Sequence, residues 1–309
     1  MANHTDSSIC FATLALGARH VFHAQQLATD LERYAPGSLL VVLSDQPTAF
    51  ADCNNVIAAP HQQQSPFRCF HDKRFLFKTA FTHADTCVVI DANIRLLAPL
   101  RPKDTDLLDP GINAAHLYTI QSKWQSDEQN EEAVSPALRR EQEIVNRVLD
   151  SVGLEAGTVR FPQEYLYAVK RSSNAIKIQS WLEAWGHLAH YFDYHRLPWS
   201  EGFGIGIAAA VAGLPIECVR VIPDAGYYKE RTHLFNLKSF RNPVSEAQEH
   251  CHAQQELIKR SFFPPPGRFG TMKRRLGQIY RYTRLRAQYR TDQKWLSGLK
   301  QIQDSSRPN

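Results

Sequence analysis

The sequence lacks the features that would mark a membrane, secreted or metal-cysteine protein. No run reaches the roughly 18 apolar residues that a membrane-spanning helix needs; the longest, Gly202–Ile216, contains Pro215 and indicates a buried core helix. The polar N-terminus shows no basic segment followed by an apolar one, so we expect no secretion. The six cysteines include no CxxC pair, which argues against a zinc site and favours a reducing, cytoplasmic compartment.

Several nucleotide-binding and catalytic motifs are also missing. The sequence has no GxxxxGK[ST], no GxGxxG after the first apolar run and no GxSxG. This argues against P-loop proteins, dinucleotide-binding Rossmann sites and α/β-hydrolases, because each of these needs its glycines for a tight backbone approach or turn. Residues 16–20 do not match the Gly-rich signature of sugar nucleotidyltransferases. The glycines at 202, 204 and 206 follow a loop, and they indicate close helix packing.

What is present is a regular alternation of strand and helix patterns in the first hundred of 309 residues. Continuous apolar strands between helices are typical of a parallel sheet covered on both faces, so we expect an α/β fold. Ligands of such sheets bind beyond the carboxyl ends of the strands, where Asp45 and Asp91 follow two of the runs. The expected strands are Ile9–Leu16, Leu39–Leu43, Asn55–Ala58 and Thr86–Ile90, and the expected helices are 20–34 and Phe70–Ala84.

The middle of the chain is less regular. The polar segment Lys123–Ser135 is predicted to be an exposed loop or lid. Helices are expected over Ala137–Val152, over the aromatic-rich residues 174–192 and over the small-residue segment 203–213, with a strand over Phe161–Lys170 between the first two.

The charge is unevenly distributed. Residues 267–309 hold eleven Lys and Arg against two acids, which gives +9 and leaves −4 for the rest of the chain. The run 264–267 (Pro-Pro-Pro-Gly) is a stiff break before this segment. Basic residues interleaved with Tyr, Ile and Leu suit an anionic membrane surface, although a solvated or partner-facing helix or a nucleic-acid site would have the same composition. We therefore divide the chain into a body, 1–263, and a basic helical tail, 264–309.

The segment around Asp91 resembles the GT-A glycosyltransferases, which use nucleotide-sugar donors. In that family an Asp-x-Asp motif at a strand end often follows a helix carrying Arg or Lys and precedes an apolar strand. Here Thr86–Ile90 leads into Asp-Ala-Asn at 91–93 and then Ile94–Leu100, after the basic segment Lys73–Lys78. The order is similar to that of glycosyltransferase family 8-like enzymes. The resemblance implies a Rossmann-like, mainly parallel mixed sheet flanked by helices, with residues 1–100 binding the nucleotide sugar and 101–263 the acceptor.

The resemblance also implies a metal site for Mn²⁺ or Mg²⁺. A nucleoside diphosphate leaves readily only when its negative charge is neutralised. A divalent cation held by carboxylates supplies the neutralising positive charge. Asp91 would be a ligand, Asn93 occupies the place of the second Asp and would bind without charge, and His233 has the position of a completing His. The alternatives are that residues 91–93 form an ordinary strand-to-turn cap and that His233 is structural.

The remaining donor contacts follow from the same resemblance. Asp45 would contact the nucleoside, and Arg74, Lys78 and Lys238 would neutralise the diphosphate of a UDP-sugar. Arg74 and Lys78 are four residues apart, so we expect them on one helix face, directed either to the phosphates or to solvent.

The acceptor half is expected to supply a carboxylate. Glu201 lies at the start of the small-residue helix, two residues after Trp199, an aromatic residue that can stack on a sugar. We predict that Glu201 is the general base or an acceptor contact; the alternative is an acid stabilised by the helix N-terminus. Glu164 and Asp193 are other carboxylates considered for this role.

The sequence thus predicts a cytoplasmic, metal-dependent glycosyltransferase of hexosyltransferase type, peripheral on the inner face of a membrane. Its acceptor would be a cell-envelope or lipid-linked glycan. Two rival functions remain: a catalytically silent GT-A-like module that binds nucleotide or glycan, motivated by Asn93, and a nucleic-acid-binding protein that acts through the basic tail.

Overall fold

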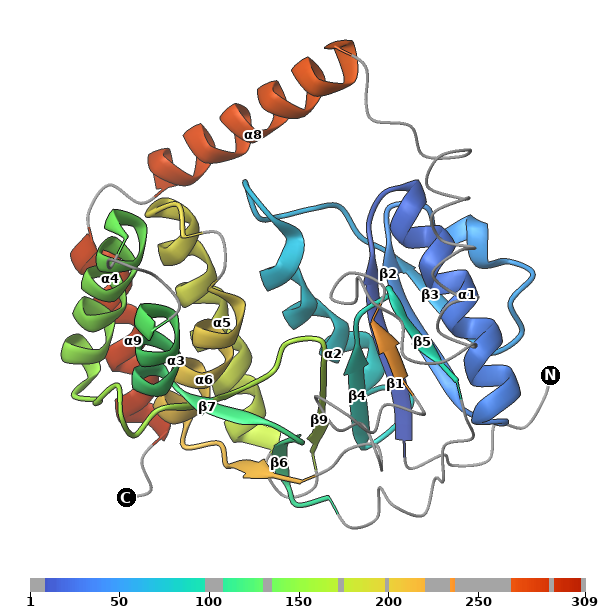
Figure 1. Ribbon diagram of the computed structural model, residues 1–309, viewed down its shortest axis with the longest axis horizontal. Helices are drawn as coiled ribbons and strands as arrows, with labels where there is room; N and C mark the ends of the chain where they lie inside the picture. Colours follow the sequence, from blue (N-terminus) through green and yellow to red (C-terminus); the bar gives the residue numbers. More distant parts are fainter. Residues whose placement is uncertain are drawn as a thin grey trace.

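A computed structural model describes most of the chain as a sheet with helices on both faces (Figure 1). The described residues are 9–97, 108–129, 135–171, 175–197, 200–219, 234–236, 268–288 and 292–306. Within them, no helix combines the length and the apolar composition needed to cross a bilayer.

The centre of the fold is a seven-stranded mixed sheet with the strand order β10-β6-β9-β4-β1-β2-β3. Its strands are β1 (Ile9–Ala15), β2 (Leu39–Ser44), β3 (Val56–Pro60), β4 (Thr86–Ile90), β6 (Gly111–Ala114), β9 (Leu166–Lys170) and β10 (Ile216–Cys218). β1 pairs in parallel with β2 and β4, as does β2 with β3 and β10 with β6, whereas β9 is antiparallel to β4 and β6. The predicted α/β fold with a mainly parallel sheet is confirmed, and it is consistent with a Rossmann-like architecture.

Two apolar cores lie on opposite faces of this sheet, because successive side chains of a strand point to opposite sides. In β1, Cys10 and Ala12 belong to one core and Phe11 and Ala15 to the other. The second core is covered by α1 (Ala18–Tyr34). The first is covered by α2 (Leu76–Ala80), α4 (Pro136–Val152), α5 (Ala175–Tyr194), α6 (Glu201–Ala212) and α9 (Asp292–Ser306).

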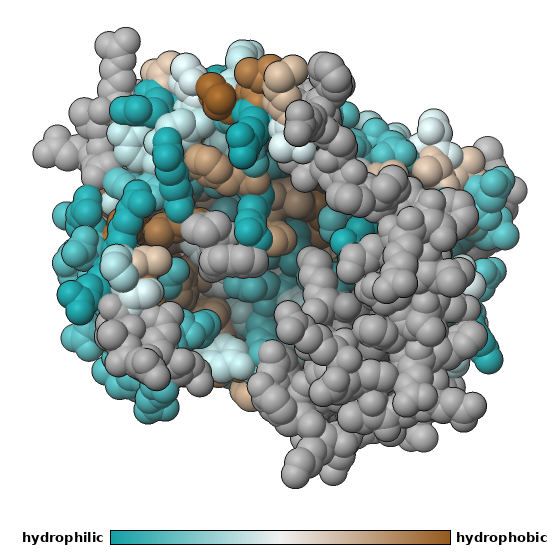
Figure 2. All heavy atoms as spheres, turned by 45° about the horizontal axis from the view of Figure 1, so that its top comes forward, coloured by the Kyte–Doolittle hydropathy of each residue, from teal (hydrophilic) through white to brown (hydrophobic). Residues whose placement is uncertain are grey.

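Smaller elements surround the sheet. Two antiparallel pairs join β5 (Ile94–Leu96) to β11 (Leu234–Asn236) and β7 (Leu117–Thr119) to β8 (Arg160–Pro162). The other elements are two 3-10 helices, η1 (Pro47–Phe50) and η2 (Cys69–Phe75), and the helices α3 (Ile120–Gln129) and α8 (Arg268–Gln288). α8 runs across the top of Figure 1, and Figure 2 turns this side forward, where apolar side chains are exposed at the upper edge.

Three local predictions were wrong. The polar segment from Lys123 is not a loop: residues up to 129 form α3, because Ile120 and Trp124 are buried on one side of it. The single strand expected over Phe161–Lys170 is two strands, β8 and β9, which belong to different sheets. The helix expected over Phe70–Ala84 is a 3-10 helix followed by the short α2. In η2 the side chain of Arg74 donates to the carbonyl oxygen of His71, an acceptor that an α-helix uses for its own main chain.

Candidate active site

A largely buried group of charged side chains lies at the carboxyl end of β4. Nζ of Lys73, on η2, is 2.7 Å from Oδ1 of Asp91 and 3.1 Å from Oε1 of Glu201. The same nitrogen donates to the main-chain carbonyl of Glu164 at 2.9 Å, and the Glu164 carboxylate accepts from the Gly202 amide at 2.8 Å. The side chains of Lys73 and Glu201 are 6% and 4% exposed, whereas that of Asp91 is 23% exposed. Asp91 is therefore more accessible to a ligand than Lys73 or Glu201.

The electrostatics of this group favour proton transfer. Burial by itself lowers the pKa of Lys73, but the carboxylates of Asp91 and Glu201 raise it above its ordinary value, so Lys73 stays charged. Burial raises the pKa of Glu201 well above its ordinary value, against the opposing effect of Lys73, and it raises that of Glu164 in the same way. A carboxyl group with a raised pKa is a stronger base once it is ionised, which suits general acid–base chemistry.

Glycines at the start of α6 bring this helix close to β8. A Cβ at Gly202 would lie 2.7 Å from Cδ2 of Phe161 and 2.8 Å from Oε1 of Glu164, and one at Gly206 would lie 2.5 Å from the carbonyl oxygen of Arg160. The close packing predicted for these glycines is confirmed. It brings Glu201, the first residue of α6, next to Glu164 and Lys73.

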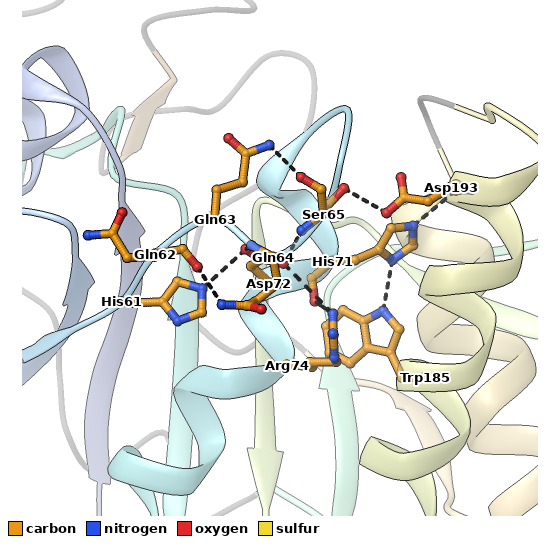
Figure 3. A network of polar contacts seen from close by, with 11 residues as sticks. His61, Gln62, Gln63, Gln64, Ser65, His71, Asp72, Arg74, Trp185 and Asp193 are labelled. Atoms are coloured by element: carbon orange, nitrogen blue, oxygen red, sulfur yellow. Dashed lines mark hydrogen bonds and ion pairs between the residues drawn. The ribbon is translucent and has the colours of Figure 1, made fainter. Parts of the chain in front are cut away.

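A second polar network holds the segment that leads into η2 (Figure 3). Asp72 accepts from the amides of Gln64 and Ser65 at 2.7 and 3.3 Å, and its Oδ2 lies 3.1 Å from Nε2 of His61. Ser65 in turn donates its hydroxyl to Oδ2 of Asp193, on α5, at 2.7 Å. Because Asp72 precedes Lys73, these contacts fix the position of the lysine.

The start of α6 is fixed by a buried histidine. Nε1 of Trp185 donates to Nδ1 of His71 at 3.0 Å (Figure 3). On the other side of the ring, Nε2 of His71 lies 3.0 Å from the hydroxyl oxygen of Ser200. Burial lowers the pKa of His71 to about 3, so the ring is neutral near pH 7. With Nδ1 accepting, the ring proton is on Nε2 and is donated to Ser200, the residue before Glu201.

Asp45 lies at a second strand end, as the sequence predicts. Its Oδ1 accepts a hydrogen bond of 2.9 Å from the amide of Gly17. Gly17 has φ +81°, a conformation that favours glycine, and it lies between β1 and α1. The contact joins the carboxyl ends of the neighbouring strands β1 and β2.

Arg74 and Lys78 do not share one helix face, so the prediction of a shared face was wrong. Arg74 is buried in η2, where its guanidinium carbon lies 4.1 Å from the centre of the Phe75 ring and one nitrogen donates to the carbonyl of His71. Lys78 is exposed on α2. The chain changes from a 3-10 helix to an α-helix between these two residues. Because the two helix types differ in the number of residues per turn, side chains four residues apart across the change are not aligned as they are within one α-helix. Lys238 lies outside the described residues.

The predicted metal ligands are only partly described. Asp91 and Asn93 flank the turn between β4 and β5; Asn93 is 3% exposed, and His233 lies outside the described residues. In the part of the chain that the structure describes, no three His, Cys, Asp or Glu side chains are grouped to hold a metal ion. Mg²⁺ commonly takes only one or two protein carboxylates and completes its shell with water and substrate phosphates. The carboxylate of Asp91 fits that kind of site.

The sequence prediction did not select Lys73. It belongs to a charged run, Asp72 to Arg74, and such runs are typical of a solvated surface. Nothing in the spacing indicates that Lys73 is buried among acids 18 and 128 residues further along the chain. Glu164 was considered as an acceptor-side carboxylate, and the structure places it in the same group.

Comparison with known proteins assigns no family to the chain. No protein-family model matches it, and no curated protein matches it significantly. The features that bear on function are therefore the α/β fold and the geometry at the end of β4.

Proposed function

We propose that this protein is a metal-dependent glycosyltransferase of the GT-A type. It would move a sugar from a nucleoside-diphosphate-sugar donor, such as a UDP-sugar, to a glycan or lipid-linked acceptor. The observation that carries the proposal is the grouping of Asp91, Glu164 and Glu201 about Lys73 at the carboxyl end of β4. In open α/β sheets this end of the strands is where ligands bind.

The arrangement of the strands supports a nucleotide site beside this group. β1 lies between β2 and β4, so the residues that follow β2 and β4, Asp45 and Asp91, are separated by two strand spacings, or about 10 Å. A nucleoside diphosphate can span that distance, with its nucleoside near Asp45 and its phosphates near Asp91. The main-chain bond from Gly17 holds the Asp45 carboxylate at this edge of the sheet.

Asp91 is the residue that would hold a divalent cation, with Asn93 and His233 as further predicted ligands. When bound, Mn²⁺ or Mg²⁺ would neutralise the diphosphate as the bond to the sugar breaks. Lys73 holds one oxygen of Asp91, Oδ1, and so fixes the orientation of the carboxylate.

Glu201 would act on the acceptor. In a direct displacement, the acceptor hydroxyl oxygen forms a bond to the anomeric carbon and its proton passes to Glu201. The bond from that carbon to the diphosphate oxygen breaks, and the nucleoside diphosphate leaves with the electron pair. Only the ionised form of Glu201 can take the proton, and its raised pKa gives turnover that increases with pH.

A second candidate function, binding of a nucleotide or glycan without turnover, is favoured by one specific contact. The Lys73 ammonium lies 2.7 Å from Oδ1 of Asp91, where it supplies a positive charge that a metal would otherwise supply. Asn93 adds no negative charge to attract a cation. A protein of this kind would bind the nucleotide equally well with and without metal.

A thermal-shift measurement tests both candidates, because a ligand that binds only the folded state raises the unfolding temperature. The wild type, Asp91→Asn and the exposed control Asp150→Asn would be compared with nucleoside diphosphates and UDP-sugars, with and without Mn²⁺. A shift that requires both ligand and metal, that is lost in Asp91→Asn and kept in Asp150→Asn, together with release of nucleoside diphosphate, supports the transferase. A metal-independent shift without turnover supports the binding module. No shift with any nucleotide contradicts both.

A further inference from the structure

Helix α8 contacts the rest of the described protein through one side. The hydroxyl of Tyr282 donates to the main-chain oxygen of Tyr194 at 3.3 Å, and its ring lies 5.4 Å from that of Phe67. The guanidinium of Arg196 lies 4.7 Å from the centre of the same ring. Leu285, one turn further along α8, is 4% exposed. The inner side of α8 therefore packs on the end of α5 and on the segment that precedes η2.

The opposite side of α8 carries large apolar side chains in solvent. Met272, Leu276, Ile279 and Tyr280 are 53%, 58%, 61% and 68% exposed. Spacings of three and four residues place them on one helix face. Leu276 and the buried Leu285 are nine residues apart, which is about half a turn in projection at 3.6 residues per turn, so this outer stripe faces away from the body.

Cations border the outer stripe. α8 contains seven Lys and Arg and neither Asp nor Glu. Arg275, Arg284 and Arg286 are exposed, and helical geometry places each of them about 80–100° from Leu276, Arg284 on one side of the stripe and the other two on its other side. An exposed apolar stripe between rows of arginines is the pattern of a helix that lies in a membrane interface.

We propose that α8 binds the surface of an anionic lipid bilayer, with its outer stripe among the acyl chains next to the headgroups and its arginines on lipid phosphates. A bilayer uses both features of the helix. A nucleic acid would use the cations but not the apolar stripe, and a second copy would bring two helices of charge +7 together. This inference is independent of the proposed transfer reaction. The bilayer would lie on the side of the protein where Phe67 contacts α8, and Phe67 is six residues before Lys73 of the candidate site.

Vesicle co-sedimentation of the full chain tests the proposal. The vesicles would contain phosphatidylcholine alone or with about one-third phosphatidylglycerol, whose negative charge attracts basic segments. The variant is Leu276→Glu with Ile279→Glu. The matched control is Ile176→Glu, which places the same charge on an 82% exposed apolar residue near the start of α5, about 27 Å along that helix from Tyr194. A further variant, Arg275→Gln with Arg284→Gln, reduces charge and leaves the stripe intact.

The wild type and Ile176→Glu should bind the anionic vesicles. The glutamate double variant should bind at least about tenfold more weakly, and the glutamine double variant should lose affinity and salt dependence. All of the substituted side chains are exposed, so unfolding temperatures should stay near that of the wild type. No binding of the wild type to anionic vesicles, or equal binding of the glutamate double variant, overturns the proposal. A dimer in solution that the glutamate double variant dissociates also overturns it. DNA binding that is equal in the wild type and the glutamate double variant, with neither protein bound to vesicles, overturns it as well. In each of these cases the metal-dependent nucleotide shift is unaffected, so failure here is distinct from failure of the proposed function.

Discussion

Nζ of Lys73 and Oδ1 of Asp91 are 2.7 Å apart, and this contact joins η2 to the residue that follows β4. The lysine is 6% exposed and also contacts Glu201, at the start of α6. One side chain thus connects the sheet to two helical elements at the candidate site. Burial by itself lowers the pKa of this lysine, and the carboxylates of Asp91 and Glu201 more than offset that effect.

Replacing this lysine should strongly destabilise the fold. Lys73→Met leaves the carboxyl groups of Asp91, Glu164 and Glu201 without their buried cation, and breaking a buried ion pair from one side costs about 3–5 kcal/mol. Urea unfolding at pH 7 measures the loss. Adding Glu201→Gln to Lys73→Met should recover part of it by removing one buried acid. If Lys73→Met unfolds at the same urea concentration as the wild type, the cluster does not depend on this charge.

Glu201→Gln separates catalysis from folding. Burial raises the pKa of Glu201 well above its usual value, so this position favours an uncharged group, and the amide of glutamine is close to the carboxyl group in shape. We expect an unfolding temperature near that of the wild type, unchanged nucleotide binding, and loss of sugar transfer by about 10²-fold or more, the typical contribution of a general base. The control is Glu183→Gln, at an exposed position of α5. Full turnover in Glu201→Gln would rule out its role as the base.

The stability contribution of Asp193 should depend on pH. Burial raises its pKa from 3.8 to about 7. Between these values the folded protein binds a proton that the unfolded chain does not, so this group favours folding at low pH. That contribution falls by at most about 1.4 kcal/mol per pH unit as pH rises to 7. Asp193→Asn does not titrate and keeps an oxygen for the Ser65 hydroxyl.

Chemical unfolding of the wild type and Asp193→Asn at several pH values from 4 to 8 tests this sign. The variant should gain stability relative to the wild type as pH rises, and the difference should level off above about pH 7. A difference that stays constant over this range would show that Asp193 titrates near its ordinary value.

Two helical glycines should respond to alanine in opposite directions. At Gly202 a Cβ would lie 2.7 Å from Phe161 and 2.8 Å from Glu164, so Gly202→Ala must displace one of them at a cost of about 1–3 kcal/mol. At Gly186, inside α5, the nearest atom to a Cβ would be Nε of Arg74 at an ordinary 3.7 Å. Gly186→Ala should stabilise the protein by about 0.5–1 kcal/mol through helix propensity. Thermal unfolding compares the two variants, and an equal effect of both would contradict the tight packing of α6.

The apolar runs of the sequence predict the parallel half of the sheet. The runs at Leu39–Leu43 and Cys87–Ile90 are apolar throughout because both faces of these strands are buried, and their ends place Asp45 and Asp91 at one edge. The glycines of α6 also revealed close packing, since only glycine leaves the backbone room to approach.

The folded structure, in contrast, sets which charges meet. Lys73, Glu164 and Glu201 are brought together from η2, the turn between β8 and β9, and the start of α6, and no local spacing relates them. It also decided which side of α8 is covered: the composition of the tail revealed its charge, but the contact of Tyr282 with Tyr194 and Phe67 leaves the apolar stripe outside. Hydrophobic periodicity acts over one element and is therefore visible in the sequence. Charge pairing and the choice of packing face depend on contacts between distant segments, which exist only in the folded chain.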